Sequence, residues 1–504
     1  MGGGVTTGVR ERERKFEAPE DARLPDPGEL FGLRVSGHDE VELDATYYDT
    51  ADLGLARAGL TLRRRVGGDD SGWHLKLPVD ADTRDEIRRP LDPATTAVPE
   101  ELVELVRVHT RDAALEPVAK ILTRRRRWQL VDDGGTRVAE VAEDGVHGVR
   151  LSPASGEENW RELEVELVGD APGRLLDAVE SELSGLGVHR SDAPSKLSRV
   201  LGDRLPAPAP GRTHRTAGDV LLDHLRTQVT TLRAQDPLVR LDAGDAVHTM
   251  RVTARRLRSI LQGHRRLIDR AATAAVVDDM RWLGAELGAA RDTEVMAARF
   301  AAAVDAVPDV DVLGPVQAQI TRRFGRQQRE GRSRALAALD SHRYLDLQAR
   351  LDDLLDRPPL TRHAAGKPRP ELRRAVRAAW RRTAARHDAL ASAGDAAERD
   401  AALHEVRKAA KRARYVTEVA ESVLGKRASR LRTRIKDVQT VLGDHQDTVV
   451  ARPVLRELGA QAHSEGHNGF TFGILYAREA AVAQELRARL PRAWKRLAKR
   501  ARSL

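Results

Sequence analysis

The chain has 504 residues, of which 41% are hydrophobic and 32% charged, and its 85 Lys and Arg against 76 Asp and Glu give a net charge of +9. The absence of cysteine excludes disulfides, thiolate metal sites and thiol nucleophiles, and is typical of a reducing compartment. No apolar run approaches the roughly 20 residues of a membrane-spanning helix. Residues 1–10 lack the apolar segment of a signal peptide. We therefore expect a soluble, cytoplasmic protein.

The charge of the chain divides at a Pro/Ala-rich segment. Residues 1–204 contain 29 Lys and Arg against 41 Asp and Glu, a net charge of −12, whereas residues 205–504 contain 56 against 35, a net charge of +21. Alternating prolines at 205–211 favour an extended spacer. The predicted parts are an N-terminal domain at 5–203, a linker at 204–212 and a C-terminal domain at 213–504. The strongly basic C-terminal part favours a polyanionic partner, which is nucleic acid, anionic lipid or polyphosphate.

Alternation of polar and apolar residues predicts β-strands through the N-terminal part. The expected strands lie at 9–16, 60–66, 73–77, 123–130, 136–142 and 161–168. A segment rich in Gly and Asp at 67–72 predicts a hairpin between the second and the third of them. Short helices are expected at 99–107, 117–121 and 173–186.

Several of these strands concentrate one sign of charge on one face. Residues two apart share a face, and this spacing separates Glu11 from Glu13, Glu164 from Glu166, Arg63 from Arg65, and Arg125 from Arg127. Neighbouring like charges on a sheet repel each other unless they are compensated. A closed barrel with a polar interior compensates them, because the acidic strands can hold a divalent cation and the basic strands the anion that accompanies it. The alternative is a solvated outer face with unrelated charges.

The segment Glu11–Lys15 matches the pattern ExExK, and further motifs follow it in a fixed order. They are Thr46–Thr50, Leu62–Arg65, Trp73–Pro78, Arg84–Glu86, Arg125, Glu164–Glu166 and Pro194–Lys196. This series resembles the CYTH family of triphosphate tunnel enzymes, which includes thiamine triphosphatases, inorganic triphosphatases and class IV adenylate cyclases. The resemblance covers residues 5–203 and implies an antiparallel eight-stranded β-barrel that forms a tunnel.

The same resemblance implies roles for the charged residues. Mg²⁺ or Mn²⁺ would be bound by Glu11, Glu13, Glu164 and Glu166, since hard cations prefer carboxylate oxygens. Glu140 and Asp144 both fit a further acidic position, and Glu162 is another candidate carboxylate. The triphosphate would be bound by Lys15, Arg63, Arg65, Lys76, Arg125, Arg127 and Lys196.

Three residues are expected to act in the chemistry itself. Tyr47 with Lys76 forms a candidate proton-handling pair, by analogy with thiamine triphosphatases, although Tyr47 as a packing aromatic is an equally good interpretation. Glu86 would orient neighbouring cations or water. A bound metal can lower the pKa of water to make the nucleophile, and phosphoryl transfer depends mainly on positioning and charge neutralisation. The sequence has no Walker motif.

The C-terminal part is rich in Ala, Leu and Arg at helical spacing and contains an internal repeat. Val247–Val252 resembles Leu403–Lys408, and Leu287–Thr293 resembles Leu442–Thr448. A Pro-rich stretch at 357–370 separates the two copies. We therefore predict an all-α bundle of two similar halves, at about 213–356 and 371–504, so that the whole chain is an α+β multidomain protein.

Each copy of the repeat carries a basic helical face. The first face contains His248, Arg251, Arg255 and Arg258, and the second contains His404, Arg407, Lys411 and Arg414, with Arg256, Lys408 and Arg412 beside them. Such a face repels itself, and a bound polyanion would remove that penalty. The alternative is a solvated basic surface.

These segments resemble the CHAD family of helical domains, which are associated with binding inorganic polyphosphate and often follow a CYTH domain. The resemblance implies polyphosphate contacts by His248, Arg251, Arg255, Arg258, His404, Arg407, Lys408, Lys411, Arg414 and His445. His445 stands where the first copy has Ala290, so the two halves are not equivalent.

Together the resemblances imply a divalent-metal-dependent triphosphatase that hydrolyses the terminal phosphate of tripolyphosphate or a related short triphosphate, with a domain that binds polyphosphate. The alternatives are a non-catalytic, polyphosphate-granule-associated protein and a class IV adenylate cyclase-like enzyme. Aromatics are scarce, at 3%, and no nucleic-acid-reading motif is present. The expected partners are therefore the triphosphate and polyphosphate, without a membrane or nucleic acid, in the cytoplasm or on polyphosphate granules.

Overall fold

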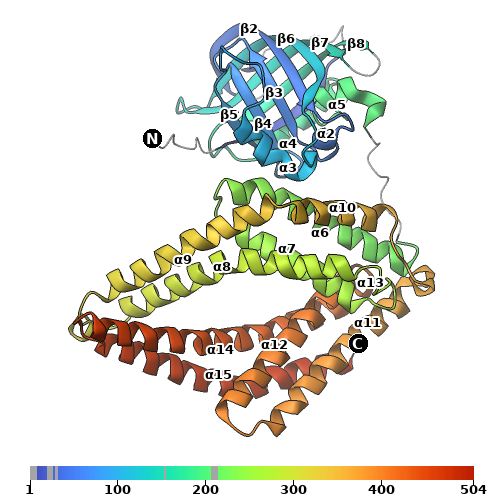
Figure 1. Ribbon diagram of the computed structural model, residues 1–504. Coiled ribbons are helices and arrows are strands. Elements are labelled where there is room, and N and C mark those ends of the chain that lie inside the picture. Colours follow the sequence, from blue (N-terminus) through green and yellow to red (C-terminus); the bar gives the residue numbers. More distant parts are fainter. Residues whose placement is uncertain (1–7, 20–26, 29–31, 152–154, 206–213, 504) are drawn as a thin grey trace. The chain divides into compact units, whose positions relative to one another are not determined.

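The computed structural model describes residues 8–19, 27–28, 32–151, 155–205 and 214–503. The chain forms two compact units, Met1–Gly211 and Arg212–Leu504 (Figure 1). The predicted linker at 204–212 lies outside the described residues from position 206 onward. None of the described helices combines the length and the apolar character that crossing a membrane requires.

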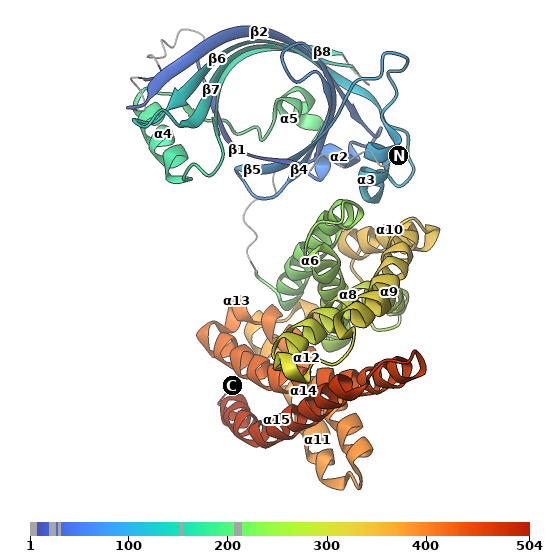
Figure 2. The same cartoon turned by 90° about the vertical axis from the view of Figure 1, so that its left-hand side faces the viewer.

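The first unit is a closed antiparallel barrel of eight strands, as the sequence predicted. The strands are β1 (Val9–Glu17), β2 (Arg34–Asp49), β3 (Thr61–Val66), β4 (Gly72–Pro78), β5 (Thr83–Arg89), β6 (Glu116–Val131), β7 (Arg137–Arg150) and β8 (Gly156–Leu167). Their order is β5-β4-β3-β2-β6-β7-β8-β1, and pairing of β1 with β5 closes the ring (Figure 2). The short strand β9 (His189–Arg190) pairs with the end of β1. The predicted hairpin at 67–72 joins β3 to β4.

Short helices accompany this barrel, most of them outside the ring (Figure 2). They are α2 (Gly54–Arg57), α3 (Glu100–Thr110), α4 (Arg174–Gly185), α5 (Lys196–Leu201) and the 3-10 turn η1 (Gly202–Arg204). The helices predicted at 99–107 and 173–186 are confirmed. The helix predicted at 117–121 is wrong, because this segment is the start of β6 and pairs with both β2 and β7. A short apolar run does not by itself distinguish a strand from a helix.

The outer face of the barrel wall is apolar where α4 covers it. Leu163 and Val165 of β8 are buried in one cluster with Leu176, Val179 and Leu183 of α4. Since successive side chains of a strand point to opposite faces, the glutamates that alternate with these residues point into the barrel. Burial of the apolar face against α4 thereby fixes the charged face inward.

Helix α5 lies inside the ring (Figure 2). Its N-cap is Ser195, whose hydroxyl oxygen accepts a hydrogen bond from the Ser198 backbone N–H. The Ser198 hydroxyl oxygen in turn accepts one from the Ser195 backbone N–H, which completes a capping box. Leu197 and Leu201 pack in one buried cluster with Trp160 and Tyr47 of the wall. The helix therefore fills part of the interior and fixes its first residue, Lys196, there.

The second unit is entirely helical. Its α-helices are α6 (Ala217–Arg240), α7 (Ala246–Gly263), α8 (Ala274–Asp305), α9 (Val316–Leu339), α10 (His342–Asp356), α11 (Pro368–Asp388), α12 (Ala396–Val419), α13 (Glu421–Leu424), α14 (Lys426–Ser464) and α15 (Phe470–Arg502). Short 3-10 turns lie at η2 (Asp309–Asp311), η3 (Arg362–Ala365) and η4 (Ala389–Ser392). Helices α6–α10 lie in the first of the two halves that the repeat predicts, and α11–α15 lie in the second.

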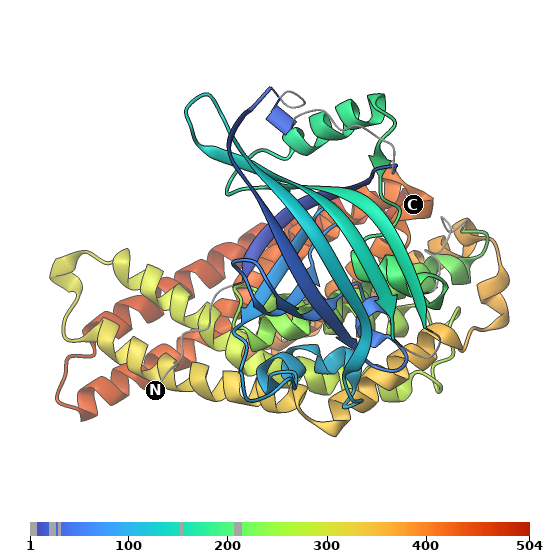
Figure 3. The ribbon, with the colours of Figure 1, turned by 90° about the horizontal axis from the view of Figure 1, so that it is seen from above.

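The halves share a core at the ends of their long hairpins. Phe300 of α8 and Phe324 of α9 pack in one buried cluster with Leu455 of α14 and Phe472 of α15. In Figure 3 the yellow α8–α9 hairpin and the red α14–α15 hairpin accordingly extend side by side. Helices α7 and α12, which carry the predicted basic faces, pack against each other, α7 also against α8 and α12 also against α14.

Candidate functional site

The barrel encloses a cavity of about 790 Å³ lined by charges of both signs. The predicted tunnel residues that line it are Glu11, Glu13, Lys15, Tyr47, Arg63, Arg65, Lys76, Arg125, Arg127, Glu140, Glu164, Glu166 and Lys196. Glu86 and Asp144 are buried in the wall beside it, 1% and 0% exposed. Acidic side chains come from β1, β7 and β8, and most of the cationic ones from β3, β4 and β6, so the two kinds face each other across the interior.

Glu166 is the centre of an acidic row that runs across three neighbouring strands. Strand pairing places Glu166 opposite Glu13 on one side and Glu140 on the other. Burial, together with the nearby carboxylates of Glu11 and Glu13, raises the pKa of Glu166 to about 8. No ion pair joins Glu166 to a described cationic residue. Buried carboxylates that repel one another fit a divalent cation, which takes oxygen ligands.

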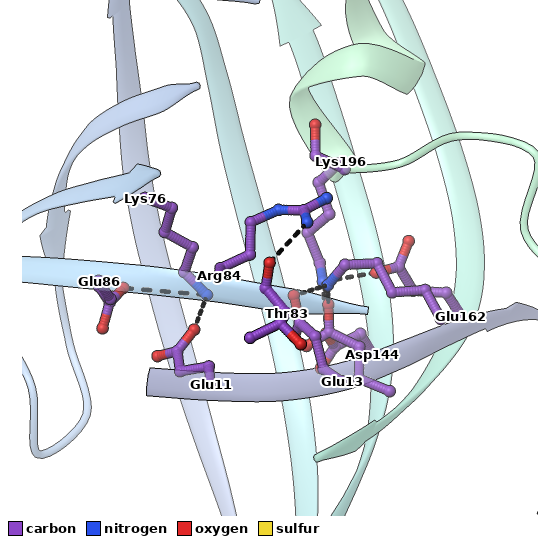
Figure 4. A network of polar contacts seen from close by, with 12 residues as sticks. Glu11, Glu13, Lys76, Thr83, Arg84, Glu86, Asp144, Glu162 and Lys196 are labelled. Atoms are coloured by element: carbon purple, nitrogen blue, oxygen red, sulfur yellow. Dashed lines mark hydrogen bonds and ion pairs between the residues drawn. The ribbon is translucent and has the colours of Figure 1, made fainter. Parts of the chain in front are cut away.

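A second acidic group surrounds the ammonium of Lys196. The Lys196 Nζ lies 2.5 Å from Glu162, 2.7 Å from Glu164 and 2.8 Å from Asp144, as Figure 4 shows in part. These three carboxylates have ligand atoms within 4.8 Å of one another, a spacing that could hold a metal ion. Burial opposes the charge on Lys196, but the three acids outweigh it and hold its pKa well above the ordinary value. The ammonium thus already occupies the position of a cation in this group.

The structure separates the two acids that the sequence left as alternatives. Asp144 accepts two hydrogen bonds from Arg125, at 2.8 and 2.6 Å, and belongs to the group around Lys196. Glu140 lines the cavity, lies opposite Glu166 and pairs with Arg137. Both residues point inward, but toward different parts of the interior.

Arginines from two strands crowd the opposite wall. Burial, together with the neighbouring charges of Arg63 and Arg125, lowers the pKa of Arg65 to about 9. Arg65 pairs with Asp70 in the hairpin, and Arg127 lies 3.1 Å from Asp69 and also pairs with Asp39. Guanidinium groups that repel one another in a closed space are stabilised by a multiply charged anion.

Lys76 is held between two carboxylates (Figure 4). Its Nζ lies 2.5 Å from Glu11 and 3.9 Å from Glu86. Burial opposes its charge, but Glu13, Glu11 and Glu86 together raise the pKa of Lys76. Lys76 therefore keeps its proton at neutral pH and acts as a fixed positive charge.

Glu86 organises the cations around it, and one of its partners, His74, was not predicted. The His74 Nδ1 lies 2.9 Å from Glu86, and its Nε2 lies 2.8 Å from the Asp70 carbonyl. Burial lowers the pKa of His74 to about 4, and Arg63 contributes, so the ring is neutral and its single N–H serves one of these two acceptors. His74 is two residues from Lys76 on β4, so both side chains lie on the same face of the strand. This spacing was the signal in the sequence that could have identified His74.

Tyr47 contacts an arginine. Its hydroxyl accepts from Arg63 at 3.3 Å and the side chain is 4% exposed. Burial alone would raise the pKa of Tyr47, but Arg63, Lys196 and Lys76 together lower it. In the predicted proton-handling pair, Tyr47 contacts Arg63 and Lys76 lies near Glu86.

The remaining predicted cations also contact acids. Lys15 pairs with Glu164 and lies 3.3 Å from Glu13, and Arg125 contacts Glu164 as well as Asp144. Every cation thus has a carboxylate nearby, which keeps the closed interior close to charge balance.

In the helical unit, equivalent glycines and acids position equivalent arginines. Arg251 of α7 donates to Asp292 of α8 at 2.6 and 3.0 Å, and its guanidinium lies over Gly288, where an added Cβ would be 3.4 Å away. In the second half Arg407 lies over Gly443 at 3.5 Å, and Asp447 is the acid with the largest effect on the pKa of Arg407. The sequence analysis did not select Asp292 and Asp447, although both lie in the repeated segments.

The two basic faces meet, and we name Arg251, Arg255, Arg407 and Lys411 the central cluster. Burial, together with the charges of Arg255, Arg407 and Arg251, lowers the pKa of Lys411 to about 7. Within the described residues no ion pair joins Arg255, Arg407 or Lys411 to a carboxylate. The Nε atoms of Arg255 and Arg407 are buried without a hydrogen-bond partner. Cations of both halves therefore share one surface.

The other predicted residues of this unit lie in different surroundings. His248 is exposed at the surface. Partial burial of its ring, together with the charge of Arg291, lowers its pKa. The His404 Nδ1 lies 2.7 Å from the Gln446 Oε1. His445 is 3% exposed, with its Nε2 3.4 Å from Asp400, so it lies beneath the surface.

The last three predicted residues flank the faces. Lys408 is exposed and pairs with Glu405 at 2.6 Å, and Arg414 lies over the ring of Tyr415. Arg258 has neighbours in Arg281, Arg255 and Arg412, which together with burial lower its pKa.

The chain thus combines a barrel that closes around opposed acids and bases with a helical bundle that carries a basic face. Family models match a CYTH domain at residues 9–200 and a CHAD domain at residues 223–456. The chain belongs to the CYTH and CHAD families and carries both domains in that order.

Similar proteins extend over the whole chain or over part of it. An uncharacterized protein of Mycobacterium tuberculosis is 38% identical over 508 residues, covering 98% of this chain and 97% of that protein. Human thiamine-triphosphatase is 35% identical over 148 residues, 25% of this chain and 57% of that enzyme.

Two solved structures resemble the chain more distantly. PptA from Streptomyces chartreusis has 22% identity and a TM-score of 0.47, over 56% of this chain and 99% of PptA. The CHAD domain from the plant Ricinus communis has 26% identity and a TM-score of 0.45, over 60% of this chain and 96% of that domain.

Proposed function

We propose that the barrel is a divalent-metal-dependent triphosphatase that releases the terminal phosphate of tripolyphosphate or a related short triphosphate, and that the helical unit binds inorganic polyphosphate. The observation that carries the first part is the enclosed cavity, in which the carboxylates gathered around Glu166 face crowded arginines. Such a cavity fits a metal ion together with the polyphosphate anion that the ion accompanies. The likeness to human thiamine-triphosphatase supports the same reaction class.

Glu11, Glu13 and Glu166 would hold Mg²⁺ or Mn²⁺, with Glu140 as the further acid. The row around Glu166 fits this role better than the group around Lys196. Among the described residues Glu166 has no ion-pair partner, whereas one ammonium contacts all three acids of the other group. When bound, the metal would neutralise phosphate charge and acidify a water molecule. Glu164 would position Lys15, Arg125 and Lys196 around the substrate.

The cationic side chains would bind and align the phosphates. Arg63, Arg65 and Arg125 offer guanidinium groups for bidentate contacts. Lys76, which stays protonated, would stabilise negative charge that develops on the phosphoryl oxygens rather than remove a proton. Glu86 would act through Lys76 and Arg63 by fixing their positions.

The lining of the cavity favours a small substrate. Among the described residues that line it, Tyr47 is the one aromatic side chain, and it is almost fully buried. A substrate with a large ring would therefore gain little stacking inside the cavity. This favours tripolyphosphate over thiamine triphosphate and ATP.

The test is phosphate release from tripolyphosphate, thiamine triphosphate, ATP and long-chain polyphosphate, each with Mg²⁺, with Mn²⁺ and with a chelator. We expect metal-dependent release, fastest with tripolyphosphate. Absence of release from every substrate would leave a non-catalytic binding protein, and formation of cyclic AMP from ATP would indicate a cyclase instead.

The helical part of the proposal rests on the central cluster, whose cations have few carboxylate partners. Titration of the full chain with polyphosphate at several salt concentrations tests it, because release of condensed counterions makes affinity fall steeply with salt. Affinity that does not change with salt would contradict binding by this cluster.

A further inference from the structure

A second group of arginines lies beyond the central cluster, and we name it the distal cluster. It consists of Arg258 on α7, Arg265 after the end of α7, Arg382 on α11 and Arg412 on α12. Arg412 lowers the pKa of each of the other three, after the effect of burial, and Arg265 also lowers that of Arg382. Cations from four segments therefore lie close enough to repel one another.

Close packing of the chain brings these segments together. An added Cβ on Gly263, the last residue of α7, would lie 2.2 Å from the Val416 side chain of α12. Only glycine allows this approach, which fixes the end of α7 one turn of α12 away from Arg412. Helix α11 packs along α12, and this contact brings Arg382 to the same place.

The distal cluster is not neutralised by the protein. Within the described part of the chain, no ion pair joins any of its four arginines to a carboxylate. Neighbouring arginines do have such partners: Arg256 lies 3.4 Å from Glu418 and Arg266 lies 2.9 Å from Glu371. Acids are thus available on these helices but do not reach the distal cluster.

The two clusters form a continuous path. Arg255 of the central cluster affects both Lys411 and Arg258, so it lies between the two groups. On α7 the distance from Arg251 to Arg258 is seven residues, which corresponds to about 10 Å of helix. A linear anion can therefore contact both clusters when it is long enough, whereas a short one can occupy one of them.

We infer that the distal cluster is a second anion subsite, which makes the helical unit bind long polyphosphate chains in preference to short ones. This inference rests on the proposed polyphosphate binding and adds a site and a chain-length preference to it. A long chain that reaches Arg265 and Arg382 gains contacts that a short chain at the central cluster cannot make.

The experiment compares variants of the full chain in the presence of a chelator, titrated with short-chain and with long-chain polyphosphate. The distal variant is Arg265→Gln with Arg382→Gln, and the central variant is Arg251→Gln with Arg407→Gln. Arg377→Gln with Arg427→Gln removes the same charge from two other exposed arginines, on α11 and α14, and is the matched control. Any binding in the barrel is common to all variants, so differences between them report on the helical unit.

We expect the distal variant to lose about tenfold in affinity for long chains and to keep its affinity for short chains. Its salt dependence for long chains should decrease by about 0.7 in slope for each lost contact, the value for a single-stranded polyanion. The central variant should lose affinity for chains of both lengths. Arg265→Lys with Arg382→Lys, which keeps both charges, should restore most of the long-chain affinity.

Two outcomes of the polyphosphate titrations would overturn the inference while leaving polyphosphate binding intact. One is a distal variant that loses no more than the matched control, and the other is an equal loss for short and long chains. If wild-type protein binds neither polymer, the proposed function of the helical unit fails first. The inference would also be overturned if duplex DNA binding depended on Arg265 and Arg382 as strongly as long-chain polyphosphate binding does. The distal cluster would then be a general polyanion surface.

Discussion

The two units handle charge in opposite ways. In the barrel nearly every cation contacts an acid, as Lys76 does with Glu11 and Lys196 with Glu162. On the helical face Arg255 and Lys411 meet other cations instead. A closed interior must stay near charge balance because unpaired buried charges are costly, whereas an open face can keep an excess that solvent screens. The barrel therefore suits a metal together with its anion, and the helical face suits a polyanion alone.

The strongest test of the barrel is Glu166→Gln, which removes one carboxylate from the acidic row and keeps its shape. Loss of a candidate metal ligand should reduce metal-dependent phosphate release roughly a hundredfold to a thousandfold, a range typical for removal of a key electrostatic group. Glu157→Gln, at an exposed position of the same strand, is the control and should retain wild-type rates. A Glu166→Gln enzyme with wild-type turnover at limiting metal would refute the assignment.

On the helical face, Arg251→Gln with Arg407→Gln should weaken polyphosphate binding roughly thirtyfold. Each substitution removes one charge-assisted contact, worth about 1 kcal/mol. Phosphate release in the barrel should stay unchanged in the same protein. Equal losses of polyphosphate binding and of phosphate release would contradict the assignment of these two activities to separate units.

The acidic row should also affect folding. The pKa of Glu166 in the folded state is about 8, above its ordinary value, so stability is lost as pH rises from about 4.5 to 8. Glu166→Gln should remove this loss and stabilise the metal-free protein at pH 8 by about 1 to 2 kcal/mol, discounted for partial solvent access. Thermal melts at pH 5 and pH 8 measure the difference, and a destabilised variant at pH 8 would contradict the crowding of carboxylates.

The smallest effect concerns pH and the central cluster. Lys411 faces Arg251 and Arg255 of α7 and Arg407 and Arg414 of its own helix, while Asp447 of α14 opposes them. With a pKa of about 7, Lys411 gains its proton as pH falls, so polyphosphate affinity should rise several-fold between pH 8.5 and pH 6. Lys411→Arg should bind tightly across this range. A pH profile that is identical in this variant would assign the effect to a group other than Lys411.

Period-two alternation was enough to predict the inward face of the barrel, because burial under α4 follows the same period. It could not separate Glu140 from Asp144, which share a face and differ in their partners across the sheet. The run at 117–121 was misread as a helix because five residues carry too little periodicity. In the helical unit the repeat identified the basic faces, but Asp292 and Asp447 were overlooked since single acids in an Arg-rich helix look like solvated charges. The depth of His445 depends on packing against Asp400, which no local pattern encodes.

Arg251 lies over Gly288 and Arg407 lies over Gly443 in equivalent positions of the two halves. This equivalence affects the number of ways in which a linear polymer could bind. An unbranched phosphate polymer reads the same from either end, and the helical face offers a similar set of cations from each half. Such a polymer can bind in two directions, which adds a degeneracy of two and about 0.4 kcal/mol of favourable mixing entropy, RT ln 2. The surroundings of the two halves differ, since Arg291 lies beside His248 and Gln446 beside His404. This difference would give a polymer with chemically distinct ends a preferred direction. The two orientations of polyphosphate would stay equal in energy, because its ends are equivalent.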